Sequence, residues 1–285
     1  MLNLHGGSAQ AAIRRLITGP QAPWSRCPPN AYRDGMATVT IAPVRRRRTV
    51  RTFLPPQHGA WAMLLVPYLA GIVVGGFHWL DLPLLGAWLG GYLFSYYAFQ
   101  AVKTRRPGRF REPLLLYGPV TAALAIPVLV ARPQLLWFAP AYTVLLAVNG
   151  WFAWRRRERA LVNDLASVVQ SCLMVPVVAV VAGVAPTRVA VAGLIVLLYF
   201  AGTVLFVKTM IRERGVVAYT RGSVLYHLLA FAAAAVIGVV PALVFALLLV
   251  RTWSLPGRPL TPKRVGLIEI GACVLVLLAA WSGGQ

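Results

Sequence analysis

Hydrophobic residues occur in long runs along most of this chain, and short polar segments separate the runs. A helix that crosses a bilayer needs about 20 consecutive, mainly apolar residues. Nine runs approach this length, at residues 60–79, 82–102, 113–131, 134–154, 161–184, 189–207, 223–238, 239–253 and 265–281. The pattern predicts an all-α integral membrane protein, with a nine-helix transmembrane bundle over residues 51–285.

Lys and Arg residues are concentrated in alternate connections between these runs. Of the 28 in the chain, 26 fall in five segments: residues 1–51 with nine, 103–111 with five, and 155–159, 208–221 and 251–264 with four each. The other connections contain only Arg132 and Arg188. Because cytoplasmic loops accumulate Lys and Arg, we predict that the N-terminus is cytoplasmic and the C-terminus lies outside.

Residues 223–253 could form one long helix or two short ones that meet near Gly238 and Pro241. One helix would be about 46 Å long, whereas the hydrocarbon core of a bilayer is about 30 Å thick. It would also place the basic segment 251–264 outside, against the charge rule. Two short helices satisfy both constraints, so we predict nine spans rather than eight.

Residues 1–50 differ in composition from the rest of the chain. They are polar and basic, contain several prolines, and lack an apolar core long enough for a secretory signal sequence. We expect a disordered segment. Met36 opens the segment MATVTIAPVRRRRTVRTF and is a second candidate start of translation.

The net charge of +21 raises the possibility of nucleic-acid binding, which basic patches support. The chain is, however, 59% hydrophobic with a mean hydropathy of +0.70, which is untypical of a soluble nucleic-acid module. Membrane topology and anionic lipid head groups explain the charge instead. We therefore expect membrane lipids as partners and no nucleic acid. The three cysteines have no CxxC spacing and predict no metal site.

Polar side chains inside the apolar runs are the candidates for function, because a bilayer makes them costly. Most lie toward the predicted cytoplasmic end, so a site is expected to open inward. The predicted polar pocket contains Gln57, His58, Asn163, Asp164 and His227. The candidate catalytic residues are Asp164, His58 and Glu269.

Each of these residues also has a structural explanation. Asp164 could serve the start of a helix, where an acidic side chain favours the free backbone amides and the helix dipole. His227 and Glu269 could extend to the head groups from about one turn inside their helices. His58 could lie at the membrane interface beside Trp61. The sequence leaves both kinds of interpretation open.

Three segments carry a resemblance to a known family. They are RTFLPPQHGAWAMLLVPYLAG at residues 51–71, ERALVNDLA at 158–166 and YFAGTVLFVKTMIRERG at 199–215. They resemble the YwiC-like family of bacterial membrane proteins, and the string PxQHGAWAM makes the match specific. The resemblance implies a multi-pass protein of the bacterial cytoplasmic (inner) membrane and no particular activity.

The predicted architecture is also similar to the UbiA superfamily of intramembrane prenyltransferases. That similarity implies a UbiA-like bundle with functional loops after helices two, four and six. In the superfamily, the first and third of these loops carry aspartate-rich motifs that hold magnesium against an isoprenoid diphosphate, and the second carries basic residues. Here the second loop has a counterpart in residues 155–159, but the other two carry Lys and Arg with Glu112 and Glu213 as the only acids. Magnesium requires oxygen ligands, so we expect neither magnesium nor another cofactor.

Lys and Arg can hold phosphate directly, because Arg offers a planar bidentate fork and Lys a point charge. We therefore expect a cytoplasm-facing basic cavity that binds a lipid or isoprenoid phosphate, with or without chemistry on it. Its predicted ligands are Lys103, Arg106, Arg155, Arg156, Lys208 and Arg212.

Two alternatives remain open. A transporter or channel could use Asp164, His227 and Glu269 as a proton or ion path, although few ionisable groups lie near the centres of the predicted helices. A membrane assembly protein without a site could pack through the small-residue runs at 86–91 and 230–235. The sequence does not predict the oligomeric state.

Overall fold

Helices account for nearly all of the structure, a computed structural model that describes residues 53–55, 58–258 and 260–284. These residues belong to the unit formed by residues 49–285. Its α-helices are α2 (His58–Gly75), α3 (Asp81–Thr104), α4 (Arg111–Ala131), α5 (Ala139–Trp154), α6 (Leu161–Cys172), α7 (Met174–Val181), α8 (Ala190–Val207), α9 (Val217–Ile237), α10 (Val239–Ser254) and α11 (Pro262–Gly283). The predicted N-terminal segment, Met36, Gln57 and the side chain of His58 lie outside the described residues.

The ten α-helices form nine rods, because α6 and α7 follow each other with only Leu173 between them. The rods match the nine predicted spans in order, and the described part of the chain contains no strand. The predicted break at Gly238 is confirmed, since α9 ends at Ile237 and α10 begins at Val239. A bend after Cys172 separates α6 from α7. Pro176 explains it, because proline cannot donate a hydrogen bond to the carbonyl four residues earlier and its ring crowds that carbonyl.

Two helices begin earlier than the apolar pattern predicts. α9 begins at Val217 rather than at residue 223, and α11 begins at Pro262 rather than at residue 265. Thr261 precedes α11, and its hydroxyl accepts a hydrogen bond from the backbone N–H of Arg264 at 3.4 Å. His227 and Glu269 therefore lie deeper in their helices than the single turn expected from the sequence.

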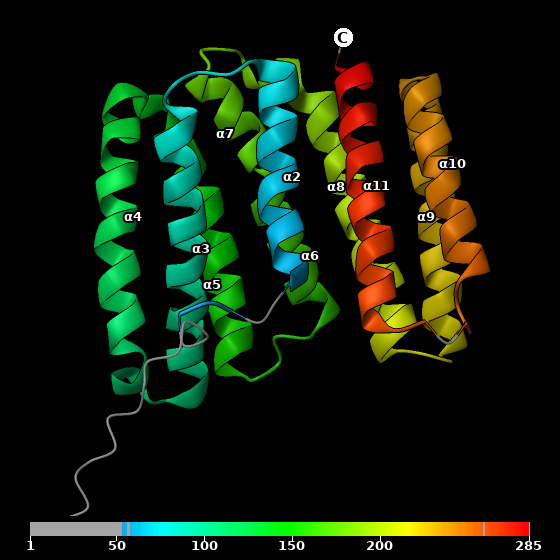
Figure 1. Cartoon of the computed structure of the whole chain (residues 1–285), viewed down its shortest axis with the longest axis horizontal. Helices are drawn as coiled ribbons and strands as arrows, with labels where there is room; N and C mark the ends of the chain where they lie inside the picture. Colours follow the sequence, from blue (N-terminus) through cyan, green and yellow to red (C-terminus); the bar gives the residue numbers. More distant parts are fainter. Residues whose placement is uncertain (1–52, 56–57, 259, 285) are drawn as a thin grey trace, which may run out of the picture. The chain divides into compact units, whose positions relative to one another are not determined.

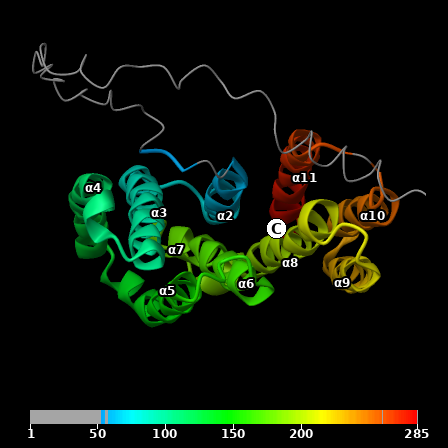
Figure 2. The same cartoon turned by 90° about the horizontal axis from the view of Figure 1, so that it is seen from below.

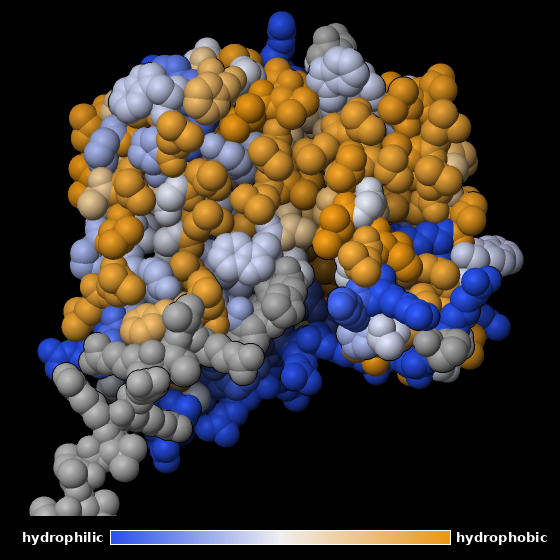
Figure 3. Space-filling model, viewed as in Figure 1, coloured by the Kyte–Doolittle hydropathy of each residue, from blue (hydrophilic) through white to orange (hydrophobic). Residues whose placement is uncertain are grey.

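The connections alternate between the two ends of the bundle. Figure 1 shows the α3–α4, α5–α6, α8–α9 and α10–α11 connections at one end and the other four at the opposite end. Most of the Lys and Arg residues of the described chain are in the first set, and hydrophilic surface gathers at that end (Figure 3). We call it the basic end; the charge rule predicts that it is cytoplasmic.

The protein is an all-α, multi-pass membrane bundle. Six helical stretches of the described residues are long and apolar enough to cross a bilayer, and two shorter apolar helices occur at Gly59–Gly75 and Val239–Ser254. Large apolar side chains cover the outside, as Figure 3 shows for one face. Val236, for example, is 89% exposed and Trp137 82% exposed. In water such a surface would be strongly unfavourable, whereas lipid chains accommodate it.

The helices form two layers within this unit (Figure 2), with α4, α3, α2, α11 and α10 in one and α5, α7, α6, α8 and α9 in the other. α8 and the α6–α7 rod are the most buried, and α4 and α5 expose most of their surface. Small residues allow close approach between helices, as is usual in membranes. Ala70, Ala179, Ala192 and Ala279 are fully buried.

The predicted small-residue runs serve packing within the chain. A side-chain carbon at Gly90 of α3 would lie 2.6 Å from the Thr121 hydroxyl of α4. Ala230 and Ala234 of α9 are also buried in the described unit. Gly90, Ala230 and Ala234 therefore pack within the chain, whereas Ala232 and Ala235 of the second run are exposed.

Gly71 provides a test of the packing between α2 and α7. An alanine Cβ there would lie 2.7 Å from Cβ of Val178 and 3.0 Å from the carbonyl oxygen of Val175. We expect Gly71→Ala to lower the free energy of unfolding by about 1–3 kcal/mol, measured as the thermal midpoint of the purified protein. Gly271 of α11 is the control, because nothing lies within 4 Å of the added carbon and Ala favours helices. An equal loss in both variants would contradict the packing.

The orientation can be tested by cysteine labelling in a variant that lacks Cys27. Arg157 at the basic end and Thr187 at the opposite end are both exposed. We expect a membrane-impermeant maleimide to label Thr187→Cys in intact cells and Arg157→Cys only after lysis, because basic loops stay inside. The reverse pattern would show the opposite orientation.

Candidate functional site

An ion pair between a buried lysine and a partly exposed aspartate joins α6 to the end of α8 at the basic end. The Lys208 ammonium lies 2.8 Å from a carboxylate oxygen of Asp164 and donates a hydrogen bond to the Arg159 carbonyl at 2.7 Å. Lys208 is only 4% exposed. It begins a single π-helical turn (Lys208–Arg212), in which the Glu213 N–H bonds to the Lys208 carbonyl at 2.7 Å. Such turns interrupt a regular helix and are frequent at functional sites.

This pair changes the interpretation of both residues. Asp164 lies four residues after Ala160, the N-cap of α6, and the structure records no side-chain cap there. Its carboxylate lies in the first turn of α6, where it suits the helix dipole, and it also pairs with Lys208. Lys208 was predicted to hold phosphate, but its ammonium already has a carboxylate and a carbonyl as partners.

A hydrogen-bond network between α5 and α6 lies beside this pair. The Asn149 amide donates to Gln170 at 3.1 Å, and the Ser167 hydroxyl lies 2.9 Å from the Asn149 amide oxygen. The Asn163 amide donates to the Glu158 carbonyl at 2.9 Å, while its side-chain oxygen is buried without a partner. Asn163 and Asp164, which are adjacent in the sequence, lie in this polar region, whereas His227 lies elsewhere.

Arginines from two connections line an open hollow at the basic end. Its lining consists of Arg105 after α3 and Trp154, Arg155 and Arg156 at the end of α5, and its volume is about 540 Å³. The Arg155 guanidinium lies over the Trp151 and Trp154 rings, at 4.7 and 5.6 Å from their centres. We call this feature the basic hollow.

Hydrogen bonds and charge pairs hold the rim of the basic hollow. Arg156 donates from Nε to the Lys103 carbonyl at 3.3 Å, which ties the end of α5 to the end of α3. The Lys103 ammonium lies 2.7 Å from the Glu158 carboxylate, and both side chains are partly exposed. Lys103 therefore supports the rim, and Arg106 and Arg212 lie in exposed positions outside the lining.

Two residues of the basic hollow have a left-handed backbone. Arg105 has φ of 54° and Arg156 has φ of 56°, and they are the only such non-glycine residues in the described part of the chain. Positions of this kind at helix ends favour glycine, and another residue costs about 1 kcal/mol there. An arginine in each of these places is therefore slightly unfavourable for folding.

A second group of polar residues lies inside the bundle, between α8, α9, α10 and α11. Arg251 of α10 forms an ion pair with Glu269 of α11. The other carboxylate oxygen of Glu269 accepts hydrogen bonds from Tyr199 at 3.1 Å and Thr203 at 3.0 Å, both on α8. We call these four residues, together with His227, the polar core.

His227 of α9 is buried close to this cluster. Its Nδ1 lies 2.7 Å from the Ser223 carbonyl, and Nε2 faces α8, where a side-chain carbon at Gly202 would lie only 2.9 Å away. The Arg251 charge is close enough to interact with the ring. With 3% exposure, His227 does not extend to the head groups, so the snorkelling alternative is wrong for this residue.

Arg251, Tyr199 and Thr203 are not among the site residues predicted from the sequence. The charge pattern placed Arg251 in a loop segment. The residue instead lies within α10, and it is only 8% exposed. A signal for this residue was available. Arg251 lies one turn before the end of α10, and Glu269 lies two turns after the start of α11, so opposite charges occur at similar depth on consecutive antiparallel helices.

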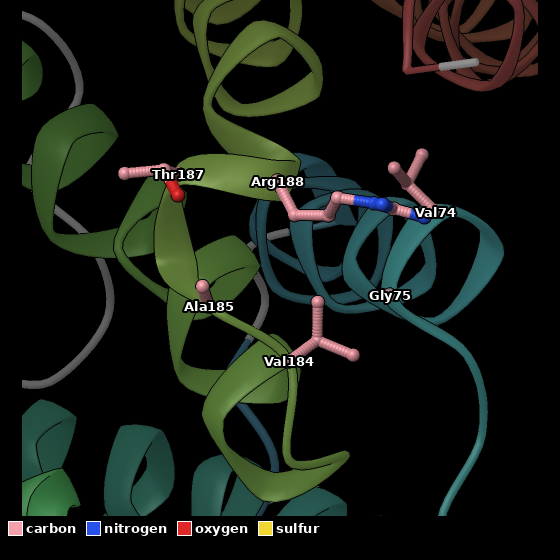
Figure 4. Close-up of a pocket in the computed structure, with 6 residues that line it drawn as sticks. All are labelled: Val74, Gly75, Val184, Ala185, Thr187 and Arg188. Carbon is pink, nitrogen blue, oxygen red and sulfur yellow. The ribbon is translucent and has the colours of Figure 1, made fainter.

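Another open hollow, of about 620 Å³, lies at the opposite end (Figure 4). It is lined by Val74 and Gly75 at the end of α2 and by Val184, Ala185, Thr187 and Arg188 between α7 and α8. Figure 4 shows the Arg188 side chain extending toward Val74. With a single charged side chain, this hollow is less suited to an anionic ligand than the basic hollow.

Comparison with known proteins agrees with the resemblance seen in the sequence. A family model described as YwiC-like protein matches residues 54–179. The chain is 34% identical over 235 residues to the uncharacterized protein YwiC of Bacillus subtilis strain 168, covering 79% of this chain and 95% of that protein. The chain belongs to the YwiC-like family.

An uncharacterized protein of Haemophilus influenzae is 32% identical over 245 residues, which are 80% of this chain and 98% of that relative. No solved structure matches the chain. The similarity to the UbiA superfamily therefore stays a prediction, whereas membership of the YwiC-like family, a bacterial membrane family, is established.

The Lys208–Asp164 pair can be tested by a double-mutant cycle. We expect Lys208→Met to lower the free energy of unfolding by about 3 kcal/mol, because it leaves a carboxylate without its buried partner. Adding Asp164→Asn should restore much of the loss, measured as thermal midpoints in one detergent. Lys103→Met is the control, since its exposed pair with Glu158 contributes about 0–1 kcal/mol. Equal losses for both lysines, or no restoration, would contradict the assignment.

Proposed function

We propose that this YwiC-like protein binds a phosphate-bearing lipid, such as an isoprenoid phosphate, in the basic hollow. The observation that carries the proposal is the convergence of Arg105, Arg155 and Arg156 on one open hollow without a carboxylate in its lining. Guanidinium groups bind phosphate oxygens through paired, charge-assisted hydrogen bonds. Three of them around one hollow concentrate positive charge on a single ligand.

The position of the basic hollow fits a lipid head group. It lies at the ends of α3 and α5, at the basic end of the membrane bundle, where head groups are within reach. Trp151 and Trp154 are half exposed beside it, and such aromatic rings favour the membrane interface. A phosphate in the hollow would leave the attached apolar chains in the lipid beside the helices.

Within the predicted phosphate ligands, the geometry favours Arg155 and Arg156 and adds Arg105. Lys103 contributes through its backbone carbonyl and its pair with Glu158, and Lys208 is held by Asp164. Binding alone is proposed for this site. The carboxylates of Asp164 and Glu269, two of the candidate catalytic groups, are both engaged in ion pairs.

The left-handed backbone of Arg105 and Arg156 allows stability and binding to be separated. We expect Arg105→Gly with Arg156→Gly to keep or raise the thermal midpoint, because glycine relieves the unfavourable φ by about 1 kcal/mol at each site. The same variant should bind phosphatidic acid or a polyprenyl phosphate about tenfold or more weakly, because two guanidinium groups are lost. Native mass spectrometry of the detergent-solubilised protein measures the bound fraction.

Phosphatidylcholine is the lipid control, and Arg188→Gly is the protein control because Arg188 lies at the opposite end. If inorganic phosphate competes with phosphatidic acid, the phosphate group alone is recognised. If inorganic phosphate does not compete, the lipid part is required. Unchanged phosphatidic acid binding in the double variant would overturn the proposal.

A further inference from the structure

Arg251 uses only part of its hydrogen-bonding capacity in the polar core. Its Nη1 pairs with Glu269, and its guanidinium carbon lies 4.1 Å from the centre of the Phe206 ring. Nε and Nη2 are buried and have no partner among the described atoms. These two nitrogens form one edge of the planar guanidinium, the edge that binds carboxylates in a bidentate manner.

Glu269 cannot satisfy this free edge. One of its oxygens is held by Arg251, and the other accepts from Tyr199 at 3.1 Å and from Thr203 at 3.0 Å. Turning the carboxylate toward Nε and Nη2 would break both bonds to α8. The ion pair therefore fixes the guanidinium and leaves its bidentate edge for another acceptor.

Unpaired N–H groups of a buried cation are costly, and in a membrane protein the surrounding lipid offers no hydrogen bonds. Ionisable side chains in this position usually mark a path or a binding site. We propose that the Nε/Nη2 edge of Arg251 binds a small planar oxyanion of the carboxylate type. The polar core would then be a solute site inside the bundle, separate from the basic hollow in both residues and helices.

The charge of the polar core suggests that a proton accompanies the anion. Arg251 and Glu269 balance each other, so an added anion would leave one uncompensated negative charge in a medium of low dielectric constant. The other titratable groups of this region are Tyr199 on α8, which bonds to Glu269, Cys273 on α11, which lies beside Tyr199, and His227 on α9 with Tyr226 in ring contact. His227 is the candidate acceptor, since the Ser223 carbonyl accepts from Nδ1, which leaves Nε2 as the nitrogen that would take a proton.

The test uses the full chain in nanodiscs of phosphatidylcholine, with formate as the probe and chloride at equal ionic strength as the control. We expect formate, but not chloride, to raise the thermal midpoint followed by tryptophan fluorescence. Lowering the pH toward the range where His227 is protonated should strengthen formate binding. For each pH unit, the formate concentration that gives half of the effect should decrease by up to about tenfold. No formate-specific rise would overturn the proposal, and a rise independent of pH would overturn its proton-linked part.

Arg251→Lys is the decisive variant, because lysine keeps a positive charge opposite Glu269 but lacks the bidentate edge. We expect it to need about tenfold more formate or more. If Arg251→Lys does not fold, Arg251→Gln with Glu269→Gln removes the edge without changing the net charge. An undiminished formate effect in either variant would overturn the proposal.

The variant Arg105→Gly with Arg156→Gly separates the two proposed sites. It should keep the formate response while it loses phosphatidic acid binding. Loss of the formate response in this variant would place the anion in the basic hollow and overturn the assignment to Arg251.

Discussion

The need to pair every buried charge within a bilayer is the constraint on which this structure depends most. A charged side chain inside a membrane protein is tolerated when a partner or a polar cavity compensates it. α8 takes part in the compensation of two such charged pairs. Through Lys208 it pairs with Asp164 of α6, and through Tyr199 and Thr203 it supports Glu269 in its pair with Arg251. One of the two most buried rods of the bundle thus also takes part in both groups of polar interactions.

The small residues of the bundle make these polar contacts possible. Gly202 of α8 leaves the space that the His227 ring occupies, since an added carbon there would lie 2.9 Å from Nε2. Gly71 similarly lets α2 approach α7. In lipid, where apolar surface gains little by association, close packing and interhelical hydrogen bonds supply the attraction between helices.

The sequence predicts those parts of the fold that local patterns determine. The number of rods follows from the apolar runs, the break at Gly238 from the length limit of a span, and the distribution of connections from alternate basic segments. The bend at Leu173 was also accessible in principle, because Pro176 marks it. The start of α9 was misplaced because the polar residues of its first turns, such as Thr220 and Arg221, hide a helix that extends beyond the apolar run.

Pairing between distant residues is the part that sequence patterns could not supply. Lys208 and Asp164 are 44 positions apart, and nothing near either residue indicates its partner. The same basic residues can set topology, bind a ligand or form an ion pair, and only their tertiary contacts distinguish these roles. Arg251 is a different case, because counting it with a basic loop explained its charge and concealed its burial, although Glu269 at a similar depth of the next helix signals the pair.

The arrangement of contacts suggests how the two halves of the bundle depend on each other. The family model matches residues 54–179, which include α2 to α6 and most of α7, and the basic hollow belongs to this half. The polar core belongs to α8–α11. The Lys208–Asp164 pair crosses the boundary, since it links α8 to α6 beside the connection that carries Arg155 and Arg156. The ion pair is thus a direct contact between the helix that follows the basic hollow in the chain and the end of the helix that carries Tyr199 and Thr203.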